Sequence, residues 1–166
     1  MIHIVLVEPE IPQNTGNISR TCAATGCALH LIKPLGFRID EKAVRRAGLD
    51  YWQYLQLTVH EDYEDFLSRE QGKGRFYYCT TKAAHPYSEM DYRREEELYF
   101  LFGKETRGLP ERILKQHPDQ CIRIPMIEEA RSLNLSNAVA IITYEALRQR
   151  DFGALKREGR LTGRID

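Results

Sequence analysis

The sequence predicts a single α/β domain, a mostly parallel sheet with helices on both faces. Short apolar runs alternate along the chain with segments of helical periodicity, which is typical of a parallel sheet. Most of these runs carry few charges and do not alternate strictly, as expected of strands that are covered on both faces. With 166 residues, one domain can bury about 70% of the surface that its unfolded chain exposes.

The elements follow from the apolar runs and from the residues that end them. Strands are expected at Ile2–Val7, Ala28–Ile32, Gln56–Val59, Arg75–Thr80, Leu98–Phe102 and Cys121–Ile124. Helices are expected at Gly16–Ala24, Glu41–Ala47, Tyr63–Arg69, Pro110–Gln116 and Leu135–Arg148. In such sheets ligands bind beyond the carboxyl ends of the strands, so the segments after Val7, Thr80, Phe102 and Ile124 are candidates for the site. We expect one domain over 1–166, with a loosely packed, Gly- and charge-rich tail over about 152–166.

Composition excludes several classes of protein. Hydrophobic residues make up 42% and charged residues 29% of the chain, which is ordinary for a globular protein. No run approaches the roughly 18 apolar residues of a membrane span. The first residues lack a basic region and a cleavage site, so they are interpreted as a strand and not as a signal peptide. A cytoplasmic protein without membrane contact is expected.

Neither the cysteines nor the histidines suggest a metal site. The cysteines are scattered without a C-x-x-C pattern, and the histidines are dispersed without metal-ligand spacing. The cysteines are interpreted as small buried apolar residues. The residues concerned are Cys22, Cys27, Cys79, Cys121, His3, His30, His60, His85 and His117.

The formal net charge is zero and gives no support to a nucleic-acid partner, although local clusters matter more than the sum. Lys42, Arg45 and Arg46 lie close together, and the segment 148–164 is rich in arginine and lysine. Solvated helix faces have the same pattern, so this signal is weak.

The segment after the first strand, residues 8–20, contains two prolines and an Asn-Thr-Gly-Asn run, which mark a fixed loop ahead of a helix. We expect Asn14 in the loop and Arg20 about one turn into the helix. An amide and a guanidinium at this edge can hold a phosphate or a ribose. A helix N-cap with a surface arginine explains the pattern equally well.

The segment 101–110 has two glycines after an apolar strand. Gly103 permits close backbone approach, Gly108 permits a second bend, and Glu105 between them can accept hydrogen bonds from either side. The spacing is neither G-x-G-x-x-G nor a P-loop, which argues against NAD or a nucleoside triphosphate. A plain strand-turn-helix connection is not excluded.

The segment 132–148 joins a polar patch to a long apolar-periodic helix. Ser132, Asn134, Ser136 and Asn137 are all typical of helix N-caps, yet one cap needs only one of them. The surplus suggests that polar groups face a ligand at the start of the helix. The chain offers no G-x-S-x-G elbow and no histidine in these segments, so hydrolase chemistry is disfavoured.

Together, three motifs resemble those of the SPOUT RNA methyltransferases. They are Asn14-x5-Arg20, Phe102-Gly103-x-Glu105-x2-Gly108-Leu109, and Ile124-Pro125-Met126 followed by Ser132-Leu-Asn134-Leu-Ser136. The stretches 8–17 and 45–51 resemble the minimal single-domain branch, the tRNA (cytidine/uridine-34)-2′-O-methyltransferases. The resemblance implies a deep C-terminal trefoil knot, an S-adenosylmethionine cofactor, a homodimer, and tRNA as substrate at its anticodon stem-loop, with leucine isoacceptors as the expected targets.

The resemblance also implies roles for individual residues. Catalytic positions carry over to Asn14, Arg20, Glu105, Ser132 and Asn134, and cofactor contacts to Cys79, Gly103, Ile124 and Ser132. Our hypothesis is that Arg20 grips the target phosphate and stabilises the emerging alkoxide, because a guanidinium is normally charged. Two alternatives are a methyltransferase acting on rRNA or at another site, and a noncatalytic RNA-binding module of the same fold.

Overall fold

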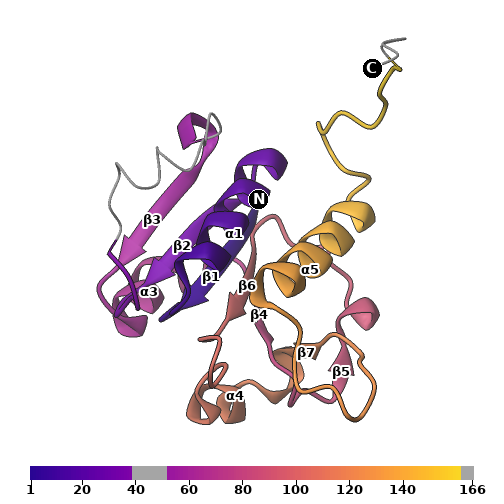
Figure 1. Ribbon diagram of the computed structural model, residues 1–166. Coiled ribbons are helices and arrows are strands. Elements are labelled where there is room, and N and C mark those ends of the chain that lie inside the picture. The colour runs from indigo at the N-terminus through magenta and orange to yellow at the C-terminus, as the bar shows by residue number, and fades with distance from the viewer. Residues whose placement is uncertain (39–51, 162–166) are drawn as a thin grey trace.

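The computed structural model describes residues 1–38 and 52–161, and its strands form one seven-stranded sheet (Figure 1). The strand order is β3-β2-β1-β6-β4-β7-β5, and every neighbouring pair is parallel. The parallel sheet predicted from the sequence is therefore confirmed. The strands are β1 (Ile2–Val7), β2 (Ala28–Ile32), β3 (Gln56–His60), β4 (Arg75–Cys79), β5 (His85–Pro86), β6 (Leu98–Phe102) and β7 (Cys121–Arg123).

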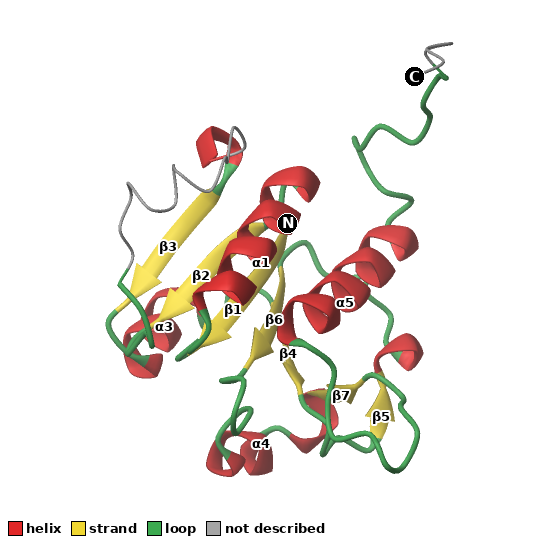
Figure 2. Cartoon of the chain, in the orientation of Figure 1, coloured by secondary structure: helices red, strands yellow, loops and turns green. Residues whose placement is uncertain are grey.

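Helices cover both faces of this sheet, as expected (Figures 1 and 2). On one face, α1 and α5 lie side by side and bury Ile18 and Val139 against a core that includes Leu6. On the other face, α3 and α4 bury Phe66 and Ile113 in a second core cluster. The described helices are α1 (Pro12–Thr25), α3 (Tyr63–Glu70), α4 (Glu111–Gln116) and α5 (Leu135–Gln149), with short 3₁₀ turns η1 (Trp52–Tyr54), η2 (Tyr87–Glu89) and η3 (Pro118–Gln120).

The helix α1 begins earlier than predicted. It starts at Pro12, whose fixed φ suits the first helical position, and not at Gly16. Asn14 therefore lies in the first turn of the helix and not in the preceding loop, which corrects the prediction. The strand β5 was not predicted, because its two residues are too few to form a pattern.

Other expectations concern single segments. The helix predicted at Glu41–Ala47 and the basic cluster around Arg45 lie outside the described residues. In the tail, Phe152 packs partly against the core, whereas Leu161 is fully exposed. Within the described chain, no helix combines the length and the apolar character needed to cross a bilayer.

Candidate active site

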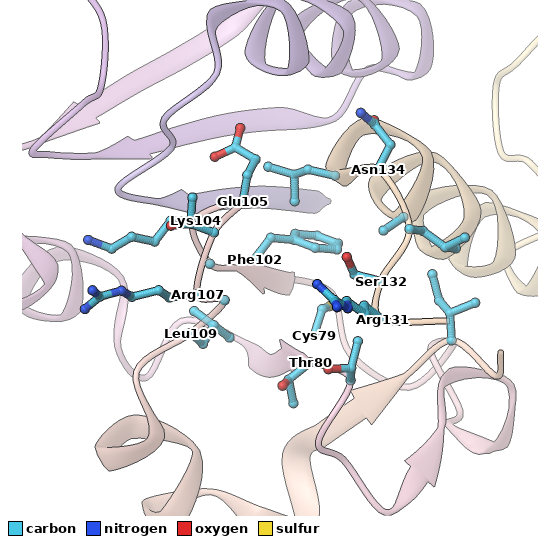
Figure 3. A pocket seen from close by; sticks show the side chains of 18 of the residues that line it. Cys79, Thr80, Phe102, Lys104, Glu105, Arg107, Leu109, Arg131, Ser132 and Asn134 are labelled. Carbon is cyan, nitrogen blue, oxygen red and sulfur yellow. The ribbon is translucent and has the colours of Figure 1, made fainter. Parts of the chain in front are cut away.

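A pocket of about 530 Å³ lies beyond the carboxyl ends of β4, β6 and β7 (Figure 3). Its volume falls in the usual range for small-molecule sites. Residues from the segments after Cys79, Phe102 and Arg123 line it, together with Ile11 and Asn14 from the segment after β1. These are the segments that the rule for open parallel sheets selected from the sequence.

All but one of the predicted site residues line this pocket. They are Asn14, Cys79, Gly103, Glu105, Ile124, Ser132 and Asn134. Arg20 is the exception: it is exposed on α1 and does not line the pocket of its own chain. Six residues at about 100° each place Arg20 some 120° around the helix from Asn14.

Glu105 joins the segment after β6 to the start of α1. Its Oε2 accepts a hydrogen bond from the Glu10 N–H at 2.8 Å. Its Oε1 accepts from the Ile11 N–H at 3.1 Å and from the Asn14 Nδ2 at 3.2 Å. The first turn of α1 has no acidic residue and Ile11 provides no side-chain cap, so Glu105 supplies the negative charge that this helix end favours. The donors therefore come from another loop and not from the bends on either side of Glu105.

Asn14 extends this connection to a third segment. Its Oδ1 accepts a hydrogen bond from the Asn134 Nδ2 at 3.0 Å. Asn134 is the N-cap of α5, and its Oδ1 accepts from the Ser136 N–H at 2.9 Å and from the Ser136 hydroxyl at 2.6 Å. We call Glu105, Asn14, Asn134 and Ser136 the loop network. It fixes three segments relative to one another, namely the loop after β6 and the starts of α1 and α5, and it assigns the capping role to Asn134.

Ser132 lies next to this network without joining it. Its side chain forms no hydrogen bond with any residue in the described part of the chain, and it lines the pocket. Its hydroxyl is therefore available to a ligand. From Ile124 to Asn134 the chain forms no helix or strand, so backbone N–H and C=O groups here can also bind a ligand.

A second set of contacts, which the sequence did not reveal, joins the loop after β1 (the first loop) to the loop after β6 (the second loop). The Glu10 carboxylate accepts hydrogen bonds from the Thr106 N–H at 3.1 Å and from the Thr106 hydroxyl at 2.8 Å. These bonds lower the pKa of Glu10. Lys104 pairs with Glu8 at 2.5 Å. The two loops thus hold each other through reciprocal contacts.

Both glycines of the second loop are required by its backbone. A Cβ on Gly103 would lie 2.0 Å from the carbonyl carbon of Gly108, so only glycine permits this approach. Gly108 has a φ of 68°, in the left-handed region. Both predictions for these glycines are confirmed.

The titratable groups of the pocket do not form a nucleophile and base. Burial raises the pKa of the Cys79 thiol well above its ordinary value, so the thiol is neutral and unreactive. Among the described residues that line the pocket, Glu105 alone carries a carboxylate, and its oxygens are occupied by three donors. Across residues 1–38 and 52–161, no group of three or more His, Cys, Asp or Glu side chains is arranged to hold a metal ion. The arrangement is suited to binding and orienting reactants.

Comparison with known proteins agrees with this architecture. A tRNA (cytidine(34)-2′-O)-methyltransferase from Yersinia pestis is 52% identical over 164 residues, covering 95% of this chain and all of that protein. A solved structure that gives insights into the 2-OH methylation of C/U34 on tRNA has a TM-score of 0.83 and 44% identity, covering 91% of this chain and 97% of that chain.

A third similar protein was solved with a cofactor. The SpoU methyltransferase AviRb from Streptomyces viridochromogenes, in complex with AdoMet, has a TM-score of 0.74 and 26% identity, covering 91% of this chain and 61% of that chain. The model of the SpoU rRNA methylase family matches residues 1–144. The chain therefore belongs to the SpoU rRNA methylase family.

Proposed function

We propose that this protein transfers the methyl group of S-adenosylmethionine to the ribose 2′-oxygen of the pyrimidine at position 34 of tRNA. The observation that carries the proposal is the convergence of Asn14, Glu105, Ser132 and Asn134 at one pocket without a nucleophile-base pair among the described residues. The similar proteins that act on cytidine 34, or on C/U34, support this substrate and this position. Because its substrate is tRNA, we propose that it acts in the cytoplasm.

The pocket fits S-adenosylmethionine by its volume and by the chemistry of its lining. Phe102, Ile122 and Ile124 offer apolar surface, and the irregular backbone from Ile124 to Asn134 offers donors and acceptors. Cys79, Gly103, Ile124 and Ser132 are the proposed contacts. The cofactor, when bound, supplies a methyl group on a sulfonium sulfur, and the neutral thioether S-adenosylhomocysteine is the leaving group.

The chain's own residues then have to align the ribose. Ser132 presents a hydroxyl without a partner among the described residues, and Asn14 is held in place by Glu105 and Asn134. Holding reacting atoms about 3–3.5 Å apart accounts for much of the rate of such a transfer. We propose that Asn14 and Ser132 orient the ribose, and that Glu105 and Asn134 fix Asn14.

Arg20 fits this scheme only in an assembled homodimer, which is part of the proposal. Arg20 does not line the pocket of its own chain, and the apolar side chains of Ile141 and Tyr144 on the neighbouring helix α5 are 37% and 49% exposed. Burial of this face against a second copy would cover apolar surface and allow the partner subunit's Arg20 to approach the pocket. The trefoil knot and the single domain over 1–166 belong to the same proposal.

The test of function is methyl transfer. Purified protein is incubated with labelled S-adenosylmethionine and total tRNA from a strain that lacks 2′-O-methylation at position 34, and the labelled nucleotide is mapped. Label at the 2′-oxygen of nucleotide 34, first in leucine isoacceptors, is expected. Label in rRNA or elsewhere in tRNA would favour another methyltransferase. Cofactor binding without any transfer, also with premodified tRNA, would favour a noncatalytic RNA-binding module.

The test of the dimer uses two variants that we expect to be inactive on their own, Arg20→Ala and Asn14→Asp. Mixed subunits regain activity if each site combines Asn14 of one chain with Arg20 of the other. Neither site of a mixed dimer is intact if both residues act within one chain. Recovery of activity on mixing is expected, and its absence in verified mixed dimers would contradict the shared site.

A further inference from the structure

We propose that Arg107 and Arg131 form a binding site for the backbone phosphates of the RNA strand that carries the target ribose. This inference rests on the proposed function and adds the groups that hold the strand at the pocket. Within the described chain, four basic side chains line the pocket, against the single carboxylate of Glu105: Lys82, Lys104, Arg107 and Arg131.

The four cations differ in their partners. Lys82 pairs with Glu111 at 2.5 Å, and Lys104 pairs with Glu8 at the same distance. Arg107 and Arg131 form no ion pair or hydrogen bond with any residue within 1–38 or 52–161, and both are exposed. Two lysines are thus neutralised within the protein, while two guanidinium groups keep their charge and their donors for a ligand.

The backbone of Arg107 is held in a tight turn. The Gly108 N–H donates to the Lys104 carbonyl at 2.7 Å and closes the turn. The residue before Arg107, Thr106, donates twice to Glu10, and Lys104 is paired with Glu8. A charged side chain on a fixed backbone loses less freedom when it binds, which favours a role in recognition.

Arg131 comes from a different segment. It directly precedes Ser132, whose hydroxyl faces the proposed ribose position. Figure 3 shows Arg107 beside Lys104 on one side of the pocket and Arg131 next to Ser132 on the other. A strand that places its ribose between these loops therefore passes both guanidinium groups.

The chemistry of a guanidinium selects the ligand. Its planar set of N–H donors matches the oxygens of a phosphate, with two parallel hydrogen bonds. An RNA strand presents one such phosphate on each side of a ribose. The carboxylate of the cofactor is a second possible anion near Arg131, and the experiment has to separate the two.

The experiment compares Arg107→Ala, Arg131→Ala and the double variant with Arg112→Ala. Arg112 is exposed on α4 and does not line the pocket, so it is the matched control. The dissociation constant of an anticodon stem-loop RNA is measured from 50 to 200 mM salt, and that of S-adenosylhomocysteine is measured by calorimetry. The kcat and KM for tRNA are measured in parallel.

Each single variant should weaken RNA binding about tenfold, as expected when a charge-assisted contact is lost. The dependence of log affinity on log salt should fall by about 0.7 per lost phosphate contact on a single strand. S-adenosylhomocysteine binding and the Arg112→Ala variant should be unchanged. Arg107→Lys and Arg131→Lys should keep most of the salt dependence but not the full affinity.

Two results would overturn the inference. One is RNA affinity and salt dependence equal to those of the control variant. The other is a loss of S-adenosylhomocysteine binding in Arg131→Ala with RNA binding intact, which would assign that guanidinium to the cofactor's carboxylate. Because RNA binding is measured without methyl transfer, failure of this site is distinguishable from failure of the proposed function, which the wild-type transfer assay reports.

Discussion

Two polar networks in this molecule each connect residues that are far apart in the sequence. The loop network of Glu105, Asn14, Asn134 and Ser136 lies at the carboxyl edge of the sheet, beside the pocket. The second network lies within the sheet, where His3, His30 and His60 from β1, β2 and β3 are hydrogen-bonded in a row. We call these three residues the histidine ladder.

The ladder is closely connected and mostly buried. The distance from His3 Nδ1 to His30 Nε2 is 2.9 Å, and that from His30 Nδ1 to His60 Nε2 is also 2.9 Å. At one end, His3 Nε2 lies 2.6 Å from the Glu97 Oε2. At the other end, His60 Nδ1 lies 3.7 Å from the Asp65 Oδ2, too far for a hydrogen bond.

These contacts determine which nitrogens carry protons. Because ionised Glu97 only accepts, His3 donates from Nε2 and accepts at Nδ1. The same direction continues through His30 to His60, so all three rings are neutral and the His60 Nδ1 is left as an acceptor without a partner among the described residues. Burial lowers the pKa of all three, that of His30 to about 4.

The difference between the two networks lies in what remains available. Nearly all ring nitrogens of the ladder are hydrogen-bonded to one another or to Glu97. Within the described structure, the His60 Nδ1 is the one of them that has no hydrogen-bond partner. The loop network borders the Ser132 hydroxyl, two exposed arginines and an irregular backbone segment. We infer that the loop network serves the reaction and the ladder serves stability, and the predictions for Asn14 and His30 test this division.

The largest effect is expected for Asn14→Asp. This change places a carboxylate where the Asn14 amide donates to Glu105, in a residue that is only 5% exposed. Two carboxylates then face each other and Asn14 no longer holds its position, so kcat/KM should fall about a thousandfold, equivalent to about 4 kcal/mol of transition-state stabilisation. Glu105→Gln in the same chain should recover part of this loss, because a glutamine amide can donate to the introduced carboxylate. Retention of more than about a tenth of the activity would show that this contact is dispensable.

The pH dependence of stability should come from the ladder. The pKa of His30 is lowered from 6.5 to about 4, so the unfolded chain binds more protons between these values. The contribution of His30 to the free energy of unfolding is therefore fully present above about pH 6.5. It is lost as the pH falls toward about 4, and the loss amounts to about 3 kcal/mol in total. Urea unfolding at several pH values measures it. The charged groups around the ladder are Glu97, Glu70, Asp65, Lys73, Arg69 and the N-terminal amine.

His30→Leu tests whether the ladder causes that dependence. Leucine removes both hydrogen bonds of the central ring and leaves His3 and His60 each without one partner, so the free energy of unfolding at neutral pH should fall by about 2 kcal/mol. The decline between about pH 7 and 4 should become shallower than in the wild type. Methyl transfer at a permissive temperature should change less than about twofold, and His85→Ala, at an exposed histidine, is the control. A large loss of kcat in the folded His30→Leu variant would contradict the inference that the ladder serves stability and not the reaction.

The two networks also differ in how far the sequence predicts them. Gly103, Glu105 and the surplus of cap residues before α5 are local patterns, and each follows an apolar strand, so their meeting at one edge could be expected. The histidines are about thirty residues apart and look dispersed. Their contact depends on register: β1 and β2 pair His3 with Ala28 and Val5 with His30, so the rings meet diagonally across the strands. Register is set by the whole sheet and is absent from any local pattern.

Several details of the site and of the sheet were also beyond local patterns. Because α1 starts at Pro12, Asn14 lies in the helix and not in the loop. Arg20 lies on another side of the same helix and does not line the pocket. The contact of Glu10 with Thr106 joins residues 96 positions apart, and two polar residues at this separation give no sign of such a pairing in the sequence. The other strands were predictable because apolar runs mark their positions, whereas β5 has only two residues.

The smallest expected effect concerns the backbone on which the loop network rests. Gly108→Ala places a Cβ at a φ of 68°, with no described atom within 4 Å to clash, so only the left-handed conformation is penalised, by about 1 kcal/mol. Gly16→Ala is the matched change inside α1, also without a contact, and should stabilise the protein by up to about 1 kcal/mol. Thermal or urea unfolding measures both. Opposite signs would show that the turn at Gly108 is held in its conformation by the surrounding loop contacts, since a turn free to relax would accept alanine without cost.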